Sequence, residues 1–461
     1  MAKLEQPGSA RMGEMPEGRL LLTLSVPMML SMLVQALYNV VDSIYVARVS
    51  EDCLTALSLA FPAQNIMIGL GTGTGVGVGT LISRALGSRN PENARRTAGT
   101  SVFLACCCWL FMLLFGLFGA RVFIHSQSAS ESIRGYALPY LRIVTIGSLF
   151  LYMQICVERL LQSTGQTRLS MWTQMCGAVT NILLDPVLIF GWFGLPALGT
   201  AGAALATVAG QAVAATVGFL FHTRKNRELR FSLRDIRPHG DIIGEVYRIG
   251  FPSILMMVLG SVTNYLMNLI LGSFTSTAVA VYGAYFKIQS FFFMPVFGMN
   301  SGMIPIIGYN YGARKIQRIR RTVFWGVAFA TTLMLIGLAV FQIFPGWILT
   351  TLFDASGAML EIGTHALRRI SPSFLLAGFC IISLSACQAL GRSVRAFVVS
   401  MLRQVVGLLP AAWLLSFTGD VNMVWWCFPI AELISVLASA FFLHTTMRDV
   451  ERELSAAPAS A

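Results

Sequence analysis

Apolar runs of about 20 residues recur along most of the chain and alternate with short polar connections. A helix of that length crosses a bilayer core of roughly 30 Å. The pattern therefore predicts about twelve spanning helices, several of them longer than about 25 residues and hence tilted or extended beyond the bilayer. The predicted ranges are 19–46, 54–83, 97–124, 136–162, 169–193, 198–222, 247–273, 277–309, 322–352, 364–390, 394–418 and 421–446.

Composition supports a membrane environment over an aqueous one. Only 12% of the 461 residues are charged, 55% are hydrophobic, and the mean hydropathy is +0.69. A soluble chain carries roughly 25% charged residues. The apolar run that follows the polar first 17 residues is too long for the core of a signal peptide, so no cleaved leader is expected.

The net charge of +12 reflects membrane topology and predicts no nucleic-acid partner. Basic residues gather in the connections after the second, sixth and eighth predicted helices, whereas the connections after the fifth, seventh and eleventh carry no Lys or Arg. Arg368 and Arg369 are an exception to this alternation. Because cytoplasmic loops are enriched in Lys and Arg, both termini are predicted to be cytoplasmic in a multi-pass protein of the cell inner (plasma) membrane, surrounded by lipid.

The chain partly matches itself when it is shifted by 225 residues. The coinciding pairs are Pro27 with Pro252, Asn39 with Asn264, Gly87 with Gly312, and Arg95-Arg96-Thr97 with Arg320-Arg321-Thr322. Each repeat then holds six helices in the same orientation, as in transporters with two parallel repeats; a duplicated channel or structural protein is the alternative. The predicted divisions are a cytoplasmic tail (1–18), an N-terminal lobe (19–223), a cytoplasmic inter-lobe loop (224–246), a C-terminal lobe (247–446) and a second cytoplasmic tail (447–461).

Two carboxylates lie deep in predicted helices of the first repeat, where a charge is costly and hence a candidate for function. Asp42 shares a helical face with Gln35 and Asn39, and Tyr38 lies beside them. Asp185 follows Asn181 by one turn, and Thr207 lies in the next helix. The equivalent positions of the second repeat are Met267 and about 409–411, which hold no acid. The pattern therefore predicts a cation or proton site in one lobe only.

The chemistry of this site stays open between two ions. Two acids with amide and hydroxyl neighbours supply the oxygen ligands that Na⁺ requires. Two nearby carboxylates can equally share a proton, because double ionisation is disfavoured. A third interpretation is structural, with each acid paired to an Arg or a helix end.

A wider set of polar, thioether and aromatic side chains on the same helices is predicted to line a substrate cavity, since such surfaces adapt to varied apolar cations. This set comprises Gln35, Tyr38, Asn39, Met153, Gln154, Glu158, Asn264, Met267, Tyr285, Gln289 and Phe293. Glu158 could instead be structural, because it neighbours Arg159. Lys287, Arg403 and Glu432 are also intramembrane, and cavity lining and structural pairing stay equal alternatives for Lys287 and Arg403.

Several sequence patterns resemble phosphate-binding, metal or catalytic sites but do not predict one. The glycine-rich "GLGTGTGVGVGT" segment lacks the Lys-Ser/Thr of a phosphate-binding loop and lies inside an apolar run, so it predicts close helix packing. The 9 Cys and 5 His form no metal-ligand or nucleophile–base pattern. Neither an enzyme nor a cofactor is predicted.

Five segments together resemble the multidrug and toxic compound extrusion family, in particular its DinF- and MepA-like bacterial branch. They are "LVQALYNVVDSIYVARV", "GTGTGVGVGTLISRALGSRNPENARRT", "TNILLDPVLIFG", "GTAGAALATVAGQ" and "ACQALGRS", and the similarity extends from about residue 18 to 446. The resemblance implies an all-α polytopic membrane protein with two six-helix bundles in a V shape. It implies export of small cationic apolar drugs in exchange for H⁺ or Na⁺.

The resemblance also implies which residues couple the ion. The family pattern falls on Asp42, Asn181, Asp185 and Thr207, which would be the ligands if the ion is Na⁺, with Gln154 where relatives often have Asn. A monomer is expected. The alternative is a lipid-linked oligosaccharide flippase of the same superfamily, whose cavity should favour Arg, whereas acids dominate here.

Overall fold

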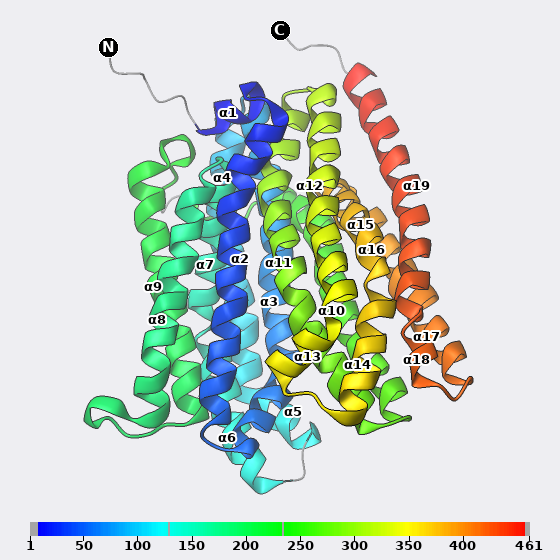
Figure 1. Ribbon diagram of the computed structural model, residues 1–461. Coiled ribbons are helices and arrows are strands. Elements are labelled where there is room, and N and C mark those ends of the chain that lie inside the picture. Colours follow the sequence, from blue (N-terminus) through cyan, green and yellow to red (C-terminus); the bar gives the residue numbers. More distant parts are fainter. Residues whose placement is uncertain (1–7, 128–129, 233–234, 457–461) are drawn as a thin grey trace.

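The computed structural model describes residues 8–127, 130–232 and 235–456, and every element assigned in them is helical. Eleven helices are long and apolar enough to span a membrane, or up to twelve if one bent pair counts as a single span. The prediction of about twelve spans is thereby confirmed. The first and last described residues, 8 and 456, lie at the same end of the helical bundle, here named the termini end (Figure 1).

The helices of the first repeat are α2 (Glu17–Ala47), α3 (Glu51–Gly87), α4 (Pro91–Leu114), α5 (Ala120–Gln127), α6 (Glu131–Ile146), α7 (Ser148–Ser163), α8 (Thr167–Phe190) and α9 (Thr200–Lys225). Those of the second are α10 (Gly240–Gly272), α11 (Ser276–Gly312), α12 (Ile316–Ile343), α13 (Pro345–Phe353), α14 (Gly357–Ile370), α15 (Pro372–Ala389), α16 (Ser393–Met401), α17 (Leu409–Ser416), α18 (Val421–Val424) and α19 (Cys427–Ala456).

Some predicted helices are interrupted. The fourth is the pair α6 and α7, which bends by 45°. The ninth was predicted to reach 352 but ends at Ile343, because Pro345 fits the first turn of a new helix and would break the interior of a continuing one. Two spans contain π-helical segments, Phe115–Gly119 and Leu402–Leu408.

The predicted tails and inter-lobe loop are more helical than expected. A short helix, α1 (Gly8–Glu14), lies in the segment predicted to be a tail, and α19 continues to Ala456. Because α9 extends to Lys225 and α10 begins at Gly240, the inter-lobe connection narrows to 226–239. Helical extensions beyond the bilayer were expected for long spans, but these boundaries were not.

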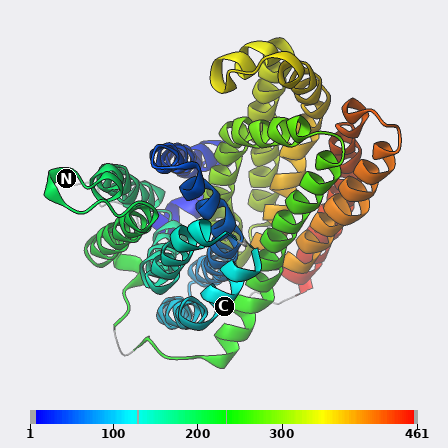
Figure 2. The same cartoon turned by 90° about the horizontal axis from the view of Figure 1, so that it is seen from below.

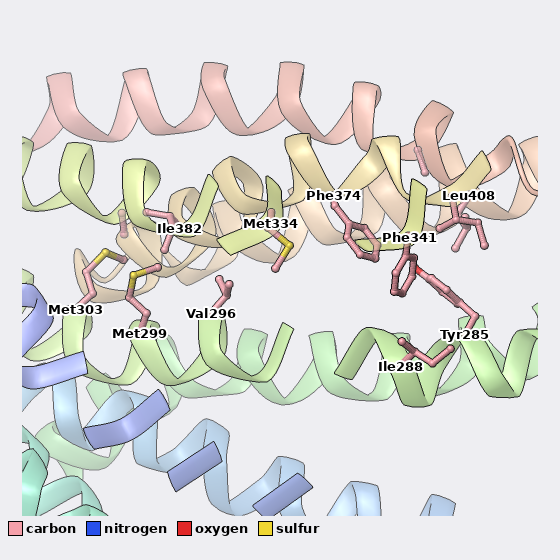
Figure 3. Close-up of a cluster of buried hydrophobic side chains, with 14 of the residues drawn as sticks. Tyr285, Ile288, Val296, Met299, Met303, Met334, Phe341, Phe374, Ile382 and Leu408 are labelled. Atoms are coloured by element: carbon pink, nitrogen blue, oxygen red, sulfur yellow. The ribbon is translucent and has the colours of Figure 1, made fainter. Parts of the chain in front are cut away.

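The helices form two groups, each with its own apolar core (Figure 2). One core is built from α3 to α9 with the far end of α2 and the first turns of α10, and the other from α11 to α19 with the far end of α10. Figure 3 shows part of the second core, in which Met299 lies beside Met303, and Phe341 packs against Phe374 with ring centroids 5.1 Å apart. The first turns of α2 also belong to this second core, through side chains such as Leu20. Helix α2 thus packs on the second lobe at the termini end and on the first lobe further along.

The two lobes touch through small residues toward the termini end. Gly73 of α3 faces Gly250 of α10, and a Cβ at Gly77 would overlap the carbonyl oxygen of Val246. Toward the opposite end, Phe61 of α3 is 56% exposed and Tyr265 of α10 is 63% exposed. The glycine-rich segment therefore serves close packing, as predicted, and the lobes separate away from the termini end.

Candidate functional site

Helices α2 and α8 run in the same direction and present matching polar stripes to each other. The Ser31 hydroxyl donates a hydrogen bond to the Gln174 side-chain oxygen, across 143 residues of sequence. The same separation relates Tyr38 to Asn181 and Asp42 to Asp185. Because each stripe repeats at helical spacing, this one contact fixes the register that brings the two aspartates to the same level.

The Asp185 side of this site is fully enclosed. Asp185 is 0% exposed and Asn181 is 3% exposed. The Asn181 Nδ2 lies 3.4 Å from Asp185 Oδ1 and 3.4 Å from the Thr207 hydroxyl oxygen. Thr207 donates its own proton to the Ala203 carbonyl at 3.0 Å, so its lone pairs face Asn181. Three of the four residues predicted for ion coupling are therefore in direct contact.

Asp42 completes the group from α2. Its charge acts on Asp185, so the two carboxylates lie within electrostatic reach of each other. Within the described ranges neither aspartate forms an ion pair. Asp42 Oδ1, Asp185 Oδ2 and Asn181 Oδ1 are buried without a hydrogen-bond partner there. Unsatisfied buried oxygens are costly, so the arrangement fits a bound proton or a small cation.

Two further side chains join this group that sequence reasoning missed. The hydroxyl of Tyr140, on α6, accepts a hydrogen bond of 2.9 Å from Gln64 of α3. Tyr140 also lies within electrostatic reach of both aspartates. No periodic pattern marks either residue in the sequence. Gln174, by contrast, shares its helical face with Asn181 and Asp185, and this spacing could have revealed it.

Glu158 and Gln154 form a separate network closer to the termini end. Gln154 Nε2 donates to Glu158 Oε1 at 2.9 Å, and Gln174 Nε2 donates to Glu158 Oε2 at 2.7 Å. Arg159 turns away from this network and donates to Gln162 Oε1 at 3.0 Å. Gln154 therefore contacts Glu158, one turn further along the same helix.

The other residues predicted to line the cavity are scattered. Asn39 is exposed, whereas Gln35 and Tyr38 are half-buried and hydrogen-bonded to each other. Met153 lies in an open groove between α7 and α9. Asn264 and Gln289 each have a buried side-chain oxygen without a partner in the described part of the chain.

Met267 and Tyr285 were expected in the cavity, but the structure places them in the packed core of the second lobe. They are 0% and 2% exposed. Tyr285 packs edge-on against Phe341 with ring centroids 6.3 Å apart (Figure 3). Phe293 is half-buried against Phe374 at 5.2 Å. Helical spacing alone could not separate a face toward the cavity from a face toward the lobe core.

The charged residues predicted inside the membrane in the second lobe are either paired with each other or exposed. Arg403, in the π-helical segment Leu402–Leu408, forms an ion pair of 2.7 Å with Glu432 of α19. This arrangement matches the structural alternative considered for Arg403. Lys287 is exposed. Among the described residues, no group of three or more His, Cys, Asp or Glu is arranged to hold a metal ion; a Na⁺ ligand set would instead combine two carboxylates with amide and hydroxyl oxygens.

The fold described above defines a polytopic membrane protein built from two parallel helical repeats. A family model, MatE, matches the chain twice, at residues 27–187 and 252–413, and these matches begin 225 residues apart. The chain therefore belongs to the MatE family, and the internal repeat read from the sequence coincides with the two matches.

Similar proteins cover nearly the whole chain. The multidrug export protein MepA of Staphylococcus saprophyticus subsp. saprophyticus is 27% identical over 422 residues, which are 91% of this chain and 92% of that protein. MepA of Staphylococcus aureus strain RF122 is 27% identical over 437 residues, 93% of this chain and 94% of that protein.

Solved structures have the same fold. A multidrug resistance MATE family transporter of the MOP superfamily in an outward-facing conformation gives a TM-score of 0.89 at 22% identity, with 96% of this chain and 98% of that chain covered. A MATE structure in the straight conformation gives 0.91 at 23% identity, with 96% and 99% covered.

Proposed function

We propose that this protein exports small cationic, partly apolar drugs from the cell and couples that export to inward movement of H⁺ or Na⁺. The observation that supports the proposal most directly is the pair of Asp42, which is half-buried, and Asp185, which is fully buried; the pair has unsatisfied buried oxygens and no basic partner in the described residues. Drugs are proposed as the exported substrate because the chain belongs to the MatE family and its MepA relatives are named as multidrug export proteins.

The exchange follows from unequal binding in two conformations. In the conformation described, the lobes meet toward the termini end and their side chains are exposed toward the other end. An ion entering from that open end neutralises the negative charge of Asp42 and Asp185. A cationic drug then loses its electrostatic attraction and leaves. The lobes rock to the opposite conformation, where the ion departs, since coupling requires each ligand to favour a different state.

The direction of transport depends on orientation. The basic connections after the second, sixth and eighth spans lie at the termini end, and Lys and Arg are enriched on the cytoplasmic side. The termini end is therefore assigned to the cytoplasm, and the open end to the outside of an inner (plasma) membrane. The conformation described is then outward-facing.

Asp42→Asn and Asp185→Asn test the coupling site directly. The purified protein is placed in proteoliposomes, and ethidium transport is driven by a pH gradient or by a Na⁺ gradient, with the other gradient absent. Either variant should lower ion-driven transport by about tenfold or more, because the charge that the ion neutralises is gone. The gradient that drives the wild type identifies the coupling ion.

The matched control is Asp241→Asn, an exposed carboxylate in the first turn of α10. It should transport within about twofold of the wild type, as surface substitutions usually change energies by less than 0.5 kcal/mol. Wild-type transport by both Asp42→Asn and Asp185→Asn would overturn the assignment of the site. Binding of a lipid-linked oligosaccharide, with no transport of ethidium, would favour the flippase alternative.

A further inference from the structure

A third carboxylate of the first lobe, Glu158, lies between the aspartate pair and the termini end. Its side chain is buried, with 6% of the residue exposed. It forms no ion pair within the described residues, and the charged or titratable groups that act on it there are Arg159 on its own helix and Tyr38 on α2. Burying an acid inside a membrane without a bonded cation costs free energy, so Glu158 is expected to have a functional role.

The surroundings of Glu158 suit a proton better than a metal ion. Both carboxylate oxygens face amide N–H groups, Oε1 that of Gln154 at 2.9 Å and Oε2 that of Gln174 at 2.7 Å. Na⁺ requires oxygen ligands, and these donors occupy the directions from which it would bind. A proton needs only one lone pair of one oxygen. Ser31 holds the Gln174 amide in place from α2 through its hydrogen bond to the other end of that amide.

A polar row connects Glu158 to the aspartates. Ser31, Gln35, Tyr38 and Asp42 occupy one face of α2, because their spacing follows the helical repeat. The Tyr38 hydroxyl lies within electrostatic reach of Asp42, Asp185 and Glu158. Tyr38 is thus in reach of all three acids, and a hydroxyl can accept one proton while it donates another.

We propose that Glu158 is a second proton-binding carboxylate, which receives the proton released by Asp42 and Asp185 and passes it to water at the termini end. The proposal rests on the proposed function and specifies its coupling ion as H⁺. In the first transfer the aspartate pair regains one negative charge and Glu158 becomes neutral. In the second, Glu158 loses the proton to water and regains its charge. Gln154 and Gln174 position the carboxylate without touching the transported ion.

The test compares net transport with exchange in proteoliposomes that contain the full chain. Net ethidium transport driven by a pH gradient requires protons to cross the protein, whereas ethidium–ethidium exchange at equal pH does not. Glu158→Gln should lower net transport by about 100-fold or more, the usual effect of removing a proton-transfer group, while exchange stays within about twofold of the wild type. Glu158→Asp should restore part of the net transport.

Gln162→Asn is the matched control, since Gln162 is a buried polar residue one turn further along α7 that hydrogen-bonds to Arg159 and Ser170. It should leave the ratio of net transport to exchange unchanged. If Glu158→Gln fails to fold, Glu158→Asp alone should still lower net transport more than exchange.

Three results would overturn the role of Glu158. They are net transport within about twofold of the wild type, a parallel loss of net transport and exchange, and a wild type driven by Na⁺ but not by a pH gradient. The last result would leave the proposed function intact, whereas a wild type that responds to neither gradient would overturn both.

Discussion

Gly77→Ala is predicted to disfavour the conformation described, because Gly77 lies where the two lobes touch. A methyl group at this position of α3 would overlap the carbonyl oxygen of Val246 and lie 3.0 Å from the Cα of that residue. These are backbone atoms of α10, so no side chain can rotate away to make room. The helices α3 and α10 must instead separate.

The structure also sets how far Gly77→Ala should shift the conformational equilibrium. Over-packing of this kind costs about 1–3 kcal/mol, and each 1.4 kcal/mol changes an equilibrium tenfold. The equilibrium should therefore shift by about 5- to 150-fold toward conformations with the lobes apart at the termini end. Gly79→Ala is the matched control on the same helix. Its new Cβ would lie 3.5 Å from the Ser163 hydroxyl oxygen, an ordinary contact inside the first lobe.

Pulsed electron paramagnetic resonance can measure this shift. Spin labels at Glu92 and Gln317, both exposed and near the termini end of different lobes, report the distance between the lobes. The 9 native cysteines are replaced first. Gly77→Ala should enlarge the long-distance population, whereas Gly79→Ala should leave it as in the parent protein. Identical distance distributions for the two variants would refute the reasoning.

Two further predictions concern charges outside the aspartate site. Arg403→Met leaves the Glu432 carboxylate buried without its partner and should lower the free energy of unfolding by roughly 3 kcal/mol, seen as a lower thermal midpoint in detergent. The double variant Arg403→Met/Glu432→Met should recover most of this loss, and equal midpoints for the single and double variants would contradict the argument. In the inter-lobe connection, the backbone N–H of Ser232 donates to Asp235 at 2.8 Å and lowers the pKa of that carboxyl below its ordinary value. The stabilisation is therefore present above the unfolded pKa of about 3.9 and is lost as the pH falls through the folded pKa. Asp235→Asn should speed hydrogen exchange of the Ser232 amide at neutral pH, with the difference disappearing once the pH falls below the folded pKa of Asp235; a difference that persists in acid that protonates this carboxyl would count against it.

The sequence alone determined the number of spans and the repeat. A bilayer allows only backbone that is hydrogen-bonded within its own segment, and its thickness fixes the length, so apolar runs translate directly into helices. The same reasoning selected Asp42 and Asp185, because an acid inside an apolar run costs free energy whichever way its side chain points. The apolar runs did not determine helix ends such as Ile343 and Gly240, because extensions beyond the bilayer follow local signals.

Only the tertiary structure decided which polar residues share a site. Periodicity assigns a residue to a face of its own helix but says nothing about the helix that faces it. Contacts between helices therefore revealed Tyr140 beside the aspartates and Gln174 beside Glu158, and they buried Tyr285 in a core instead of a cavity.

The division of α2 between the two lobes is likewise a property of packing. One uninterrupted helix looks uniform in sequence, yet its first turns pack against the second lobe and its later turns against α8. The hydrophobic pattern determined that α2 spans the membrane with Asp42 inside. The neighbours of each turn, which depend on how rigid helices fit together, determined what that aspartate can reach.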